Sequence, residues 1–324
     1  MSRVLQLNNV SITYKNKNKR VYAVRNASLS LNKGDSLGIV GESGSGKTTL
    51  AMAVLRLLPA SSIEVSGEAL FDNGPNLLAI GEKEMNALRW VKIAVVFQKA
   101  MNALSPVHRI GTMIEDIYRV HVPKATSQEV REIALRLFRL VYLPERVYRL
   151  YPHEMSGGML QRVAIAISLL HSPQLLIFDE ATTALDVVTQ GQILKEIVEM
   201  EKVLETTRIM ITHDMSVVAS SCNKIAVMYA GEIVELGFVK DVMVDPQHPY
   251  TQALIKAFPA LKGEAKVMES IPGQLPDLTE DITACVFAPR CPHAGERCRR
   301  EKPHLETDAN GGDTACFLHQ GGVQ

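Results

Sequence analysis

A glycine-rich run of eight residues constrains this chain more than any other feature: Gly41-Glu42-Ser43-Gly44-Ser45-Gly46-Lys47-Thr48. The run matches the phosphate-binding pattern G-x-x-x-x-G-K-[ST] at every fixed position. An apolar stretch at 37–40 predicts a buried strand before it, and 49–58 predicts a helix after it, which Pro59 ends. A glycine-rich loop between a strand and a helix is typical of a nucleoside-triphosphate site.

The residue types of this loop indicate how it would hold a nucleotide. The glycines let the backbone wrap an anion without clashes from Cβ atoms, so that successive N–H groups point toward phosphate oxygens. The helix that follows adds the positive end of its dipole. We expect Lys47 to reach the β- and γ-phosphates and the Thr48 hydroxyl to bind Mg²⁺. The candidate nucleotide-binding residues of this loop are Gly41, Glu42, Ser43, Gly44, Ser45, Gly46, Lys47, Thr48 and Thr49.

The composition narrows the class of protein. With 324 residues the chain has room for one large domain and a smaller appendage. Lys plus Arg equal Asp plus Glu at 35 each, which gives no charge signal for nucleic acid or an anionic membrane. The N-terminus resembles no signal segment, and the most apolar stretch, 163–178, is shorter than the ~20 residues of a membrane-spanning helix. We therefore expect a soluble, cytoplasmic protein. Because the cytoplasm keeps thiols reduced, its five cysteines are not expected to form disulfides.

Strand and helix patterns alternate along the chain and predict an α/β fold. Residues 4–40 alternate as an opening β-region, and the apolar run 93–97 predicts a strand that ends at Gln98. Thr126 and Glu129 then form a capping-box pattern ahead of helical periodicity. The segment of about 100–155 is therefore predicted to be a helical insertion between strands of the core.

Two more strands and a hairpin follow this insertion. The runs 175–178 and 208–212 predict strands, and 225–236 predicts a hairpin around Gly231. Because ligands sit at the carboxyl ends of strands in open α/β sheets, the polar residues at these ends are expected to converge on the phosphate loop. They are Gln98, Asp179, Glu180 and His213.

Each of these strand-end residues has a candidate role. Asp179 is the expected second anchor for Mg²⁺, and Glu180 is a candidate to polarise the attacking water. Taken alone, an Asp-Glu pair at the end of a strand would be interpreted as a helix N-cap. The presence of the phosphate loop favours a catalytic role instead. His213 is placed to hydrogen-bond the γ-phosphate, although a lone His is more often structural.

A second glycine-rich turn, Ser156-Gly157-Gly158, opens another expected helix that begins at Met159. A serine and two glycines at a helix start form a further anion site. One protomer has no use for two such sites on one γ-phosphate. We therefore expect a head-to-tail dimer in which each turn contacts the nucleotide held by the partner.

Together these motifs resemble the ATPases of the ABC superfamily. The run Ser156-Gly157-Gly158-Met159-Leu160-Gln161-Arg162 resembles their signature motif, and the order of the other motifs matches from the first strand to about residue 236. The resemblance implies a P-loop NTPase nucleotide-binding domain with a helical subdomain. Met159, Leu160 and Ala181 depart from the commoner residues, and none of these departures removes a phosphate or metal ligand.

The resemblance also assigns roles to single residues. It implies that Tyr14 stacks on adenine, with Tyr22 as the alternative. It implies that Gln98 senses Mg²⁺ and the transport partner, that Glu180 is the catalytic base and that His213 is the switch histidine. Asp186, after Ala184 and Leu185, would lie in the loop that crosses the dimer interface. Ser156, Gly157, Gly158 and Met159 would bind the partner's ATP.

The tail adds motifs that ATP chemistry does not explain. Residues 245–251 (DPQHPYT) and 271–276 (IPGQLP) have the composition of a Pro-rich linker. They also resemble the C-terminal extension of the oligopeptide, dipeptide and nickel importer ATPases. This resemblance predicts two domains, an ABC ATPase domain at 1–240 with its helical subdomain at about 100–160, and a cysteine-containing extension at 241–324.

Four cysteines lie close together in that extension: Cys285, Cys291, Cys298 and Cys316. Their spacing alone leaves zinc or free thiols at least as favoured as any other assignment. The run CVFAPRCPHAGERC resembles the segment that carries a [4Fe–4S] cluster in this importer family. That resemblance implies an iron–sulfur cluster bound by the four cysteines, whose charge Arg290 and its basic neighbours would offset. A redox sensor is a further alternative.

The resulting hypothesis is an ATP-hydrolysing subunit, with Mg²⁺, that energises an importer of peptides or a related solute such as an oligosaccharide or nickel. The family implies a second ATPase as heterodimer partner, two transmembrane permeases and an extracytoplasmic binding protein. It places the chain peripherally at the cytoplasmic face of the membrane. The alternative is an ABC-type ATPase acting on nucleic acid in repair or translation, which the neutral net charge and the extension disfavour.

Overall fold

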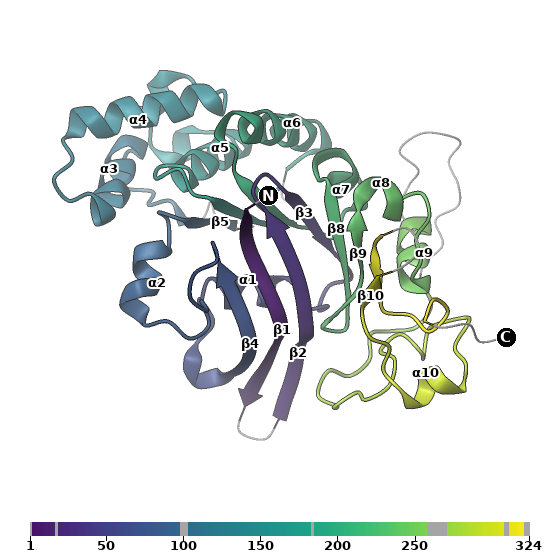
Figure 1. Ribbon diagram of the computed structural model, residues 1–324. Coiled ribbons are helices and arrows are strands. Elements are labelled where there is room, and N and C mark those ends of the chain that lie inside the picture. The colour runs from purple at the N-terminus through teal and green to yellow at the C-terminus, as the bar shows by residue number, and fades with distance from the viewer. Residues whose placement is uncertain are drawn as a thin grey trace. The chain divides into compact units, whose positions relative to one another are not determined.

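The computed structural model describes residues 2–16, 19–97, 103–182, 185–257, 271–307 and 311–320. The chain folds into two compact units (Figure 1): residues 1–79 with 210–324 form the first, and residues 80–209 form the second. The division falls within strand β7 (Thr207–Ile211). The first unit therefore combines the phosphate loop and the cysteine-bearing tail, which are far apart in the sequence.

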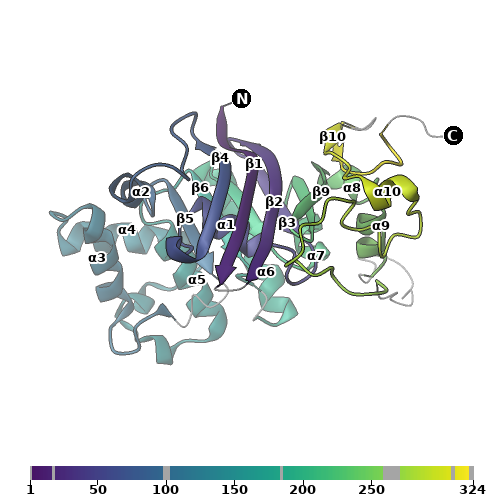
Figure 2. The ribbon, with the colours of Figure 1, turned by 90° about the horizontal axis from the view of Figure 1, so that it is seen from below.

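An antiparallel sheet opens the first unit. It contains β1 (Arg3–Asn16), β2 (Lys19–Asn32) and β4 (Ile63–Phe71), in the order β2-β1-β4, and the three strands lie side by side in Figure 2. Alternate apolar side chains of β1, such as Leu5 and Leu7, are buried, as the pleat of a strand requires. The register shifts around Asn9, which has a φ of 48°, where Gly67 of β4 passes so closely that a Cβ would lie 2.4 Å from the Asn9 carbonyl oxygen.

A second sheet in this unit carries the phosphate loop. Strand β3 (Ser36–Val40) is parallel to β8 (Lys224–Tyr229), which pairs antiparallel with β9 (Glu232–Phe238). Two short strands from the tail, β11 (Asp313–Thr314) and β10 (Glu306–Thr307), continue the sheet beyond β9. The hairpin predicted at 225–236 is confirmed. Its two-residue turn, Ala230 and Gly231, has φ values of 49° and 86°, as a turn that follows the strand twist requires.

Short helices complete the first unit. Helix α1 (Lys47–Val54) follows β3, the 3₁₀ turn η1 (Ala60–Ser62) precedes β4, and α7 (Met215–Ser221) precedes β8. The remaining helices of this unit come from the last third of the chain: α8 (Val239–Val242), α9 (Pro249–Lys256) and α10 (Glu296–Arg300).

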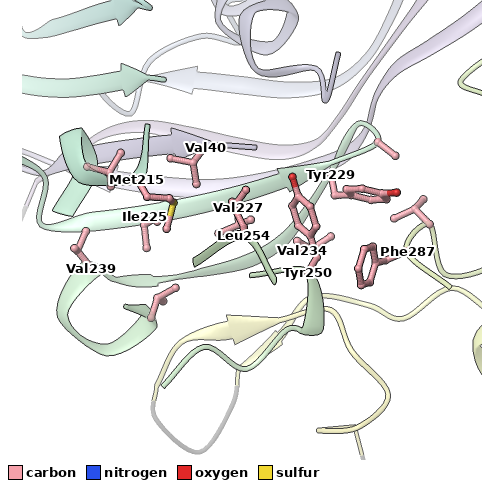
Figure 3. Close-up of a cluster of buried hydrophobic side chains, with 14 residues drawn as sticks. Val40, Met215, Ile225, Val227, Tyr229, Val234, Val239, Tyr250, Leu254 and Phe287 are labelled. Atoms are coloured by element: carbon pink, nitrogen blue, oxygen red, sulfur yellow. The ribbon is translucent and has the colours of Figure 1, made fainter. Parts of the chain in front are cut away.

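One hydrophobic cluster joins the tail to the sheet (Figure 3). Phe287 and Tyr250 from the tail pack in the same cluster as Val40, the last residue of β3. Each of these three side chains is at most 2% exposed. Burying a large apolar side chain stabilises a fold by about 1.5–3 kcal/mol. The full cluster contains Val40, Met215, Val218, Ile225, Val227, Tyr229, Ala230, Val234, Val239, Val242, Tyr250, Leu254, Val286 and Phe287.

The second unit contains a parallel strand pair and the longest of the described helices. Strand β5 (Ile93–Phe97) pairs in parallel with β6 (Leu175–Asp179), and the described residues between them contain helices. The capping box predicted at Thr126 and Glu129 is confirmed at the start of α4, where the Glu129 carboxylate accepts the Thr126 N–H at 2.8 Å. The helices and 3₁₀ turns of this unit are α2 (Glu82–Leu88), α3 (Ile110–His121), α4 (Ser127–Leu140), η3 (Glu145–Arg149), η4 (Pro152–Glu154), α5 (Gly157–Ser168) and α6 (Val187–Leu204).

Within the residues that the structure describes, none of the helices has both the length and the apolar composition needed to cross a membrane.

Candidate functional site

The phosphate loop connects β3 to α1 in a conformation that only glycine adopts readily. Gly41, Gly44 and Gly46 have φ values of 150°, 83° and 99°. Space is as restrictive as conformation, because a Cβ on Gly41 would lie 2.1 Å from the Met228 carbonyl oxygen, and one on Gly46 would lie 2.2 Å from that of Ala23. The helix begins at Lys47 and ends at Val54, so it starts two residues before the predicted 49–58 and is shorter.

The Lys47 side chain folds back over the loop. Its Nζ donates to the carbonyl oxygens of Gly41 and Glu42, each at 2.8 Å, and lies 3.3 Å from Ser45 Oγ. Lys47 is only 5% exposed and Ser45 is fully buried, whereas Ser43, Gly44 and Thr48 face solvent. The loop therefore holds a cation inside its curve and leaves backbone and the Thr48 hydroxyl accessible, an arrangement suited to binding a polyphosphate.

Glu42 is held by residues from the far end of the chain. Its backbone N–H donates to the Tyr250 hydroxyl at 3.0 Å. Its carboxylate accepts two hydrogen bonds from the Arg290 guanidinium, at 2.9 and 3.0 Å. Neither contact is predictable from the sequence, since Tyr250 and Arg290 are 208 and 248 positions from Glu42 and no local pattern links them.

The two aromatic candidates for adenine lie in different surroundings. The Tyr14 hydroxyl lies 3.3 Å from Thr49 Oγ1, in the first turn of α1, so the structure brings these two predicted residues together. The Tyr22 ring is covered by the Arg25 guanidinium at 4.7 Å, and the Tyr22 N–H donates to the Leu278 carbonyl. Tyr22 is therefore already packed against the tail, and Tyr14 is the better-placed candidate.

His213 follows β7 in the first unit. The preceding residue, Thr212, donates its N–H to the carbonyl oxygen of Ile39 at 3.2 Å, two residues before the loop. Asp214 then caps α7 by accepting the Ser216 N–H. These contacts fix the backbone on both sides of His213, whose side chain is exposed.

In the second unit, Asp179 and Glu180 end strand β6. Asp179 is 6% exposed, and Glu180 has a left-handed φ of 49°, a conformation that costs energy in a residue with a Cβ. The next helix, α6, uses Asp186 as its N-cap, so this Asp-Glu pair does not cap it. Asp179 pairs in register with Phe97, and the next residue, Gln98, lies outside the described residues.

The second glycine-rich turn is the start of α5. Ser156 is the N-cap, and its hydroxyl accepts the Met159 N–H at 3.4 Å. Gly157 is exposed, and a Cβ on Gly158 would lie 2.9 Å from the Thr189 methyl of α6. The turn therefore presents a helix N-terminus to solvent while packing closely against the neighbouring helix.

The Asp186 carboxylate at the start of α6 is kept ionised by its capping role. The N–H of Thr189 donates to it at 3.0 Å, and this hydrogen bond, with that of the Thr189 side chain, lowers the pKa of Asp186. The predicted site residues thus divide between the two units. The phosphate loop, Tyr14 and His213 belong to the first, whereas Asp179, Glu180 and the turn at Ser156 belong to the second. The predicted convergence of Asp179 and Glu180 on the phosphate loop stays a prediction.

The cysteines of the tail do not form the predicted metal site. Cys285, Cys291, Cys298 and Cys316 line one cavity of about 20 Å³, room for roughly one water molecule, and all are free thiols. Burial raises the pKa of Cys285 to about 11 and also raises the pKa of Cys291 and Cys316, which favours the protonated thiol over the thiolate that binds metals. In the described part of the chain, no group of three or more His, Cys, Asp or Glu side chains is arranged to hold a metal ion.

Comparison with known protein families matches two parts of this chain. The family described as "ABC transporter" matches residues 24–183, and the family described as "Oligopeptide/dipeptide transporter, C-terminal region" matches residues 234–298.

Several known proteins are similar over nearly the whole chain. A probable peptide ABC transporter ATP-binding protein, y4tR of Sinorhizobium fredii, is 44% identical over 91% of this chain and 89% of its own length. The oligopeptide transport ATP-binding protein OppD of Salmonella typhimurium is 42% identical over 97% of this chain and 93% of its own. The dipeptide transport ATP-binding protein DppD of Escherichia coli is 38% identical over 97% and 96%.

Solved structures show the same cassette fold. A dimeric, post-hydrolysis state of the ATP-binding cassette MJ0796 bound to ADP and phosphate has a TM-score of 0.64 and 30% identity, over 72% of this chain and 98% of that one. The protein cbiO1 from Clostridium perfringens, part of an ABC transporter complex, has a TM-score of 0.64 and 29% identity over 76% and 92%. The predicted α/β ATPase fold is confirmed at this level.

The prediction of an iron–sulfur cluster is wrong. The cavity lined by the four cysteines measures about 20 Å³, which is too small for a cluster, and the described residues contain no group arranged to hold a metal ion. The names of the similar proteins describe ATP binding and peptide transport, with no cluster. The four-cysteine spacing was compatible with a cluster, but spacing does not fix the direction or ionisation of the side chains.

Proposed function

The chain belongs to the family of ABC transporter ATP-binding proteins, and from that premise we propose that it binds and hydrolyses ATP to energise the import of peptides. One observation carries the peptide assignment, the identity of about 40% to oligopeptide and dipeptide transport proteins along almost the entire chain. The match at residues 234–298 supports this assignment, because that family is described as the C-terminal region of oligopeptide and dipeptide transporters. Nickel and oligosaccharides have no such support.

The alternative of an ATPase acting on nucleic acid is not favoured. Both matched families are described as transporters. The chain has no net charge, whereas a protein that binds a phosphate backbone needs a basic surface.

The chemistry of the site is proposed as follows. The backbone of the phosphate loop and Lys47 bind the β- and γ-phosphates of ATP. The Thr48 hydroxyl and the Asp179 carboxylate would hold Mg²⁺, since they are oxygen ligands of the hard type that it prefers, and the bound ion would neutralise phosphate charge. Glu180 accepts a proton from the attacking water, and His213 hydrogen-bonds the γ-phosphate. Gln98 senses Mg²⁺ and the transport partner.

We propose that two ATPase chains act as a head-to-tail dimer. The N-terminus of α5, with Ser156 to Met159, would contact the nucleotide in the partner's phosphate loop. The exposure of Ser156 and Gly157 supports this, since a helix N-terminus that faces solvent is available to an anion on another chain. The dimeric form of the similar cassette MJ0796 is a further support.

The remaining partners follow from the proposed role. The dimer, with a second ATPase as the partner chain, would dock on two transmembrane permeases that receive peptide from an extracytoplasmic binding protein. Its place would be the cytoplasmic face of the membrane. A domain boundary near residue 240, with a helical subdomain at about 100–160 and a cysteine-containing extension at 241–324, remains part of this proposal.

Uptake of labelled peptide by intact cells tests the function. Cells that lack their own copy of the gene receive the wild-type chain, Lys47→Ala, or Lys83→Ala as a control at an exposed lysine of α2. We expect the wild type and Lys83→Ala to restore uptake of a labelled tripeptide and Lys47→Ala to fail, with uptake of free amino acids unchanged. Normal peptide uptake without the chain, together with loss of another solute, would contradict the assignment to peptides.

A further inference from the structure

A segment of the tail runs beside the phosphate loop. The Leu278 carbonyl accepts the N–H of Tyr22, and the Glu280 carbonyl accepts a hydrogen bond from Arg25. The Leu275 methyl group lies 3.9 Å from the position of a Cβ on Gly44, within the loop itself. Residues 271–281, which we call the strap, therefore follow the edge of the nucleotide site that the phosphate loop forms.

Arg290 connects this strap to Glu42. Its Nε donates to the Pro272 carbonyl at 2.8 Å and one Nη donates to the Ile271 carbonyl at 3.1 Å, in addition to the two bonds to the Glu42 carboxylate. The guanidinium also lies 5.6 Å from the centre of the Tyr229 ring and donates to its hydroxyl at 3.3 Å. A planar guanidinium with bidentate geometry fixes direction as well as distance, which a lysine ammonium does not.

The ion pair between Arg290 and Glu42 is largely shielded from water, so water cannot easily compensate for the loss of either charge. The Arg290 side chain is 5% exposed and that of Glu42 is 26% exposed. Removal of one partner from a largely buried pair leaves the other charge uncompensated. If Arg290 were absent, a carboxylate without its counter-charge would stand in the loop that receives the triphosphate.

The backbone of Glu42 is fixed by the same part of the chain. The Tyr250 hydroxyl accepts its N–H, and Tyr250 is fully buried, with its ring centre 4.6 Å from that of Tyr229 and 5.4 Å from that of Phe287 (Figure 3). Burial raises the pKa of Tyr250, so the phenol stays protonated and neutral. The tail thus determines both the orientation of the Glu42 peptide and the charge balance at its carboxylate.

We propose that Arg290 is a positioning residue of the ATP site. From the tail it fixes Glu42 and neutralises its charge, so that docking of the strap sets the affinity of the phosphate loop for ATP. This inference rests on the proposed function, because it concerns the regulation of the same site. It makes the region after residue 241 a part of the nucleotide-binding machinery.

Equilibrium binding of a fluorescent ATP analogue to the full chain tests the proposal. We expect Arg290→Ala to raise the Kd by about five- to tenfold, the effect of one partly screened charge, and Arg290→Lys to raise it less. Arg300→Ala is the matched control, since Arg300 also pairs with a carboxylate in the tail, but with both side chains exposed at 73% and 85%. We expect that control to bind as the wild type does.

A second substitution separates charge compensation from loss of fold. Glu42→Gln introduced into Arg290→Ala removes the unpaired carboxylate and should bring the Kd back toward the wild-type value. The defect of Arg290→Ala should also shrink between 50 mM and 500 mM salt, because salt screens the repulsion. If the double variant binds as weakly as Arg290→Ala, or if Arg290→Ala and Arg290→Lys both bind normally, the proposal is wrong.

Lys47→Ala, measured in the same assay, distinguishes this inference from the proposed function. Loss of binding in Lys47→Ala with normal binding in Arg290→Ala rejects only the role of Arg290. Normal binding in Lys47→Ala rejects the ATP site itself. Should Arg290→Ala fail to fold, the Kd values of Arg290→Lys and Arg300→Lys are compared instead, because both variants keep the positive charge. A higher Kd for Arg290→Lys supports the role of Arg290, and equal Kd values reject it.

Discussion

Arg162 of α5 donates two hydrogen bonds to the carboxylate of Glu196 on α6, at 2.9 and 2.8 Å. The two side chains are 14% and 9% exposed, so the pair is largely shielded from water. It ties α5, the helix that Ser156 caps, to its neighbour α6 within the second unit.

This pair predicts a stability effect. Arg162→Ala leaves the Glu196 carboxylate buried without its partner, and we expect it to lower the free energy of unfolding by about 3 kcal/mol. Urea unfolding of the full chain measures the change. Arg139→Ala is the control, because its pair with Glu145 is 65% and 62% exposed and contributes about 0–1 kcal/mol at most. Equal effects of the two substitutions would contradict the buried role of Arg162.

Glu180→Gln should bind ATP and nearly abolish its hydrolysis. The amide cannot accept a proton from water, while the phosphate loop in the other unit is unchanged. General-base catalysis contributes about 10²–10⁴-fold, so the loss should fall in that range. Phosphate release by the assembled transporter measures hydrolysis, and Glu132→Gln, at an exposed carboxylate of α4, is the control. Retention of more than about a tenth of the wild-type rate would remove Glu180 from this role.

Ser156→Arg should act on the partner's nucleotide. The bulky cation would obstruct the N-terminus of α5, so we expect hydrolysis to fall at the phosphate loop of the partner chain, with ATP binding by this chain retained. Photolabelling with an azido-ATP trapped by vanadate, followed by separation of the two ATPase chains, shows which site is affected. A defect confined to this chain's own loop would rule out the head-to-tail arrangement.

His248 should make stability depend on pH. It is 2% exposed, and burial, together with the nearby His319, lowers its pKa to about 3. Its Nδ1 accepts the N–H of Tyr250 at 3.0 Å, which requires the neutral ring. Because the unfolded chain binds a proton near pH 6.5 and the folded chain does not, this contribution is full above pH 6.5 and is lost as the pH falls toward 3.

His248→Asn tests that pH dependence, since Asn also caps helices well. The free energy of unfolding of the wild type should fall by up to ~1.4 kcal/mol per pH unit below 6.5, and that of the variant should fall less steeply. His293→Asn, at an exposed histidine of the same region, should keep the wild-type slope. An unchanged slope in His248→Asn would show that other groups carry the effect.

Local sequence patterns predicted much of the fold and the conformation of the phosphate loop. The glycines of the phosphate loop were predictable because each occupies a backbone conformation or a space that excludes a Cβ. The capping box at Thr126 and the turn at Ala230 and Gly231 were predictable for the same reason, since a few adjacent residues determine each geometry.

Contacts between distant residues were not predictable in this way. Arg290 was assigned to balance the charge of a cluster, and its actual partner, Glu42, lies 248 positions earlier. Only tertiary packing of the tail against the loop brings them together. The cysteines show the same limit, because the four half-buried thiols line a cavity with no room for the cluster that the family resemblance implied.

The short strands β11 and β10 have a consequence for solubility. Strand β11 pairs with β9 at Glu235 and Leu236, and β10 pairs in turn with β11, so the two strands cover this part of the β9 edge. An uncovered edge strand presents a row of free N–H and C=O groups to which another molecule can add a strand. A chain cut after residue 257 would expose β9, and we expect it to self-associate. The last residues of the tail thus protect the molecule against edge-to-edge aggregation.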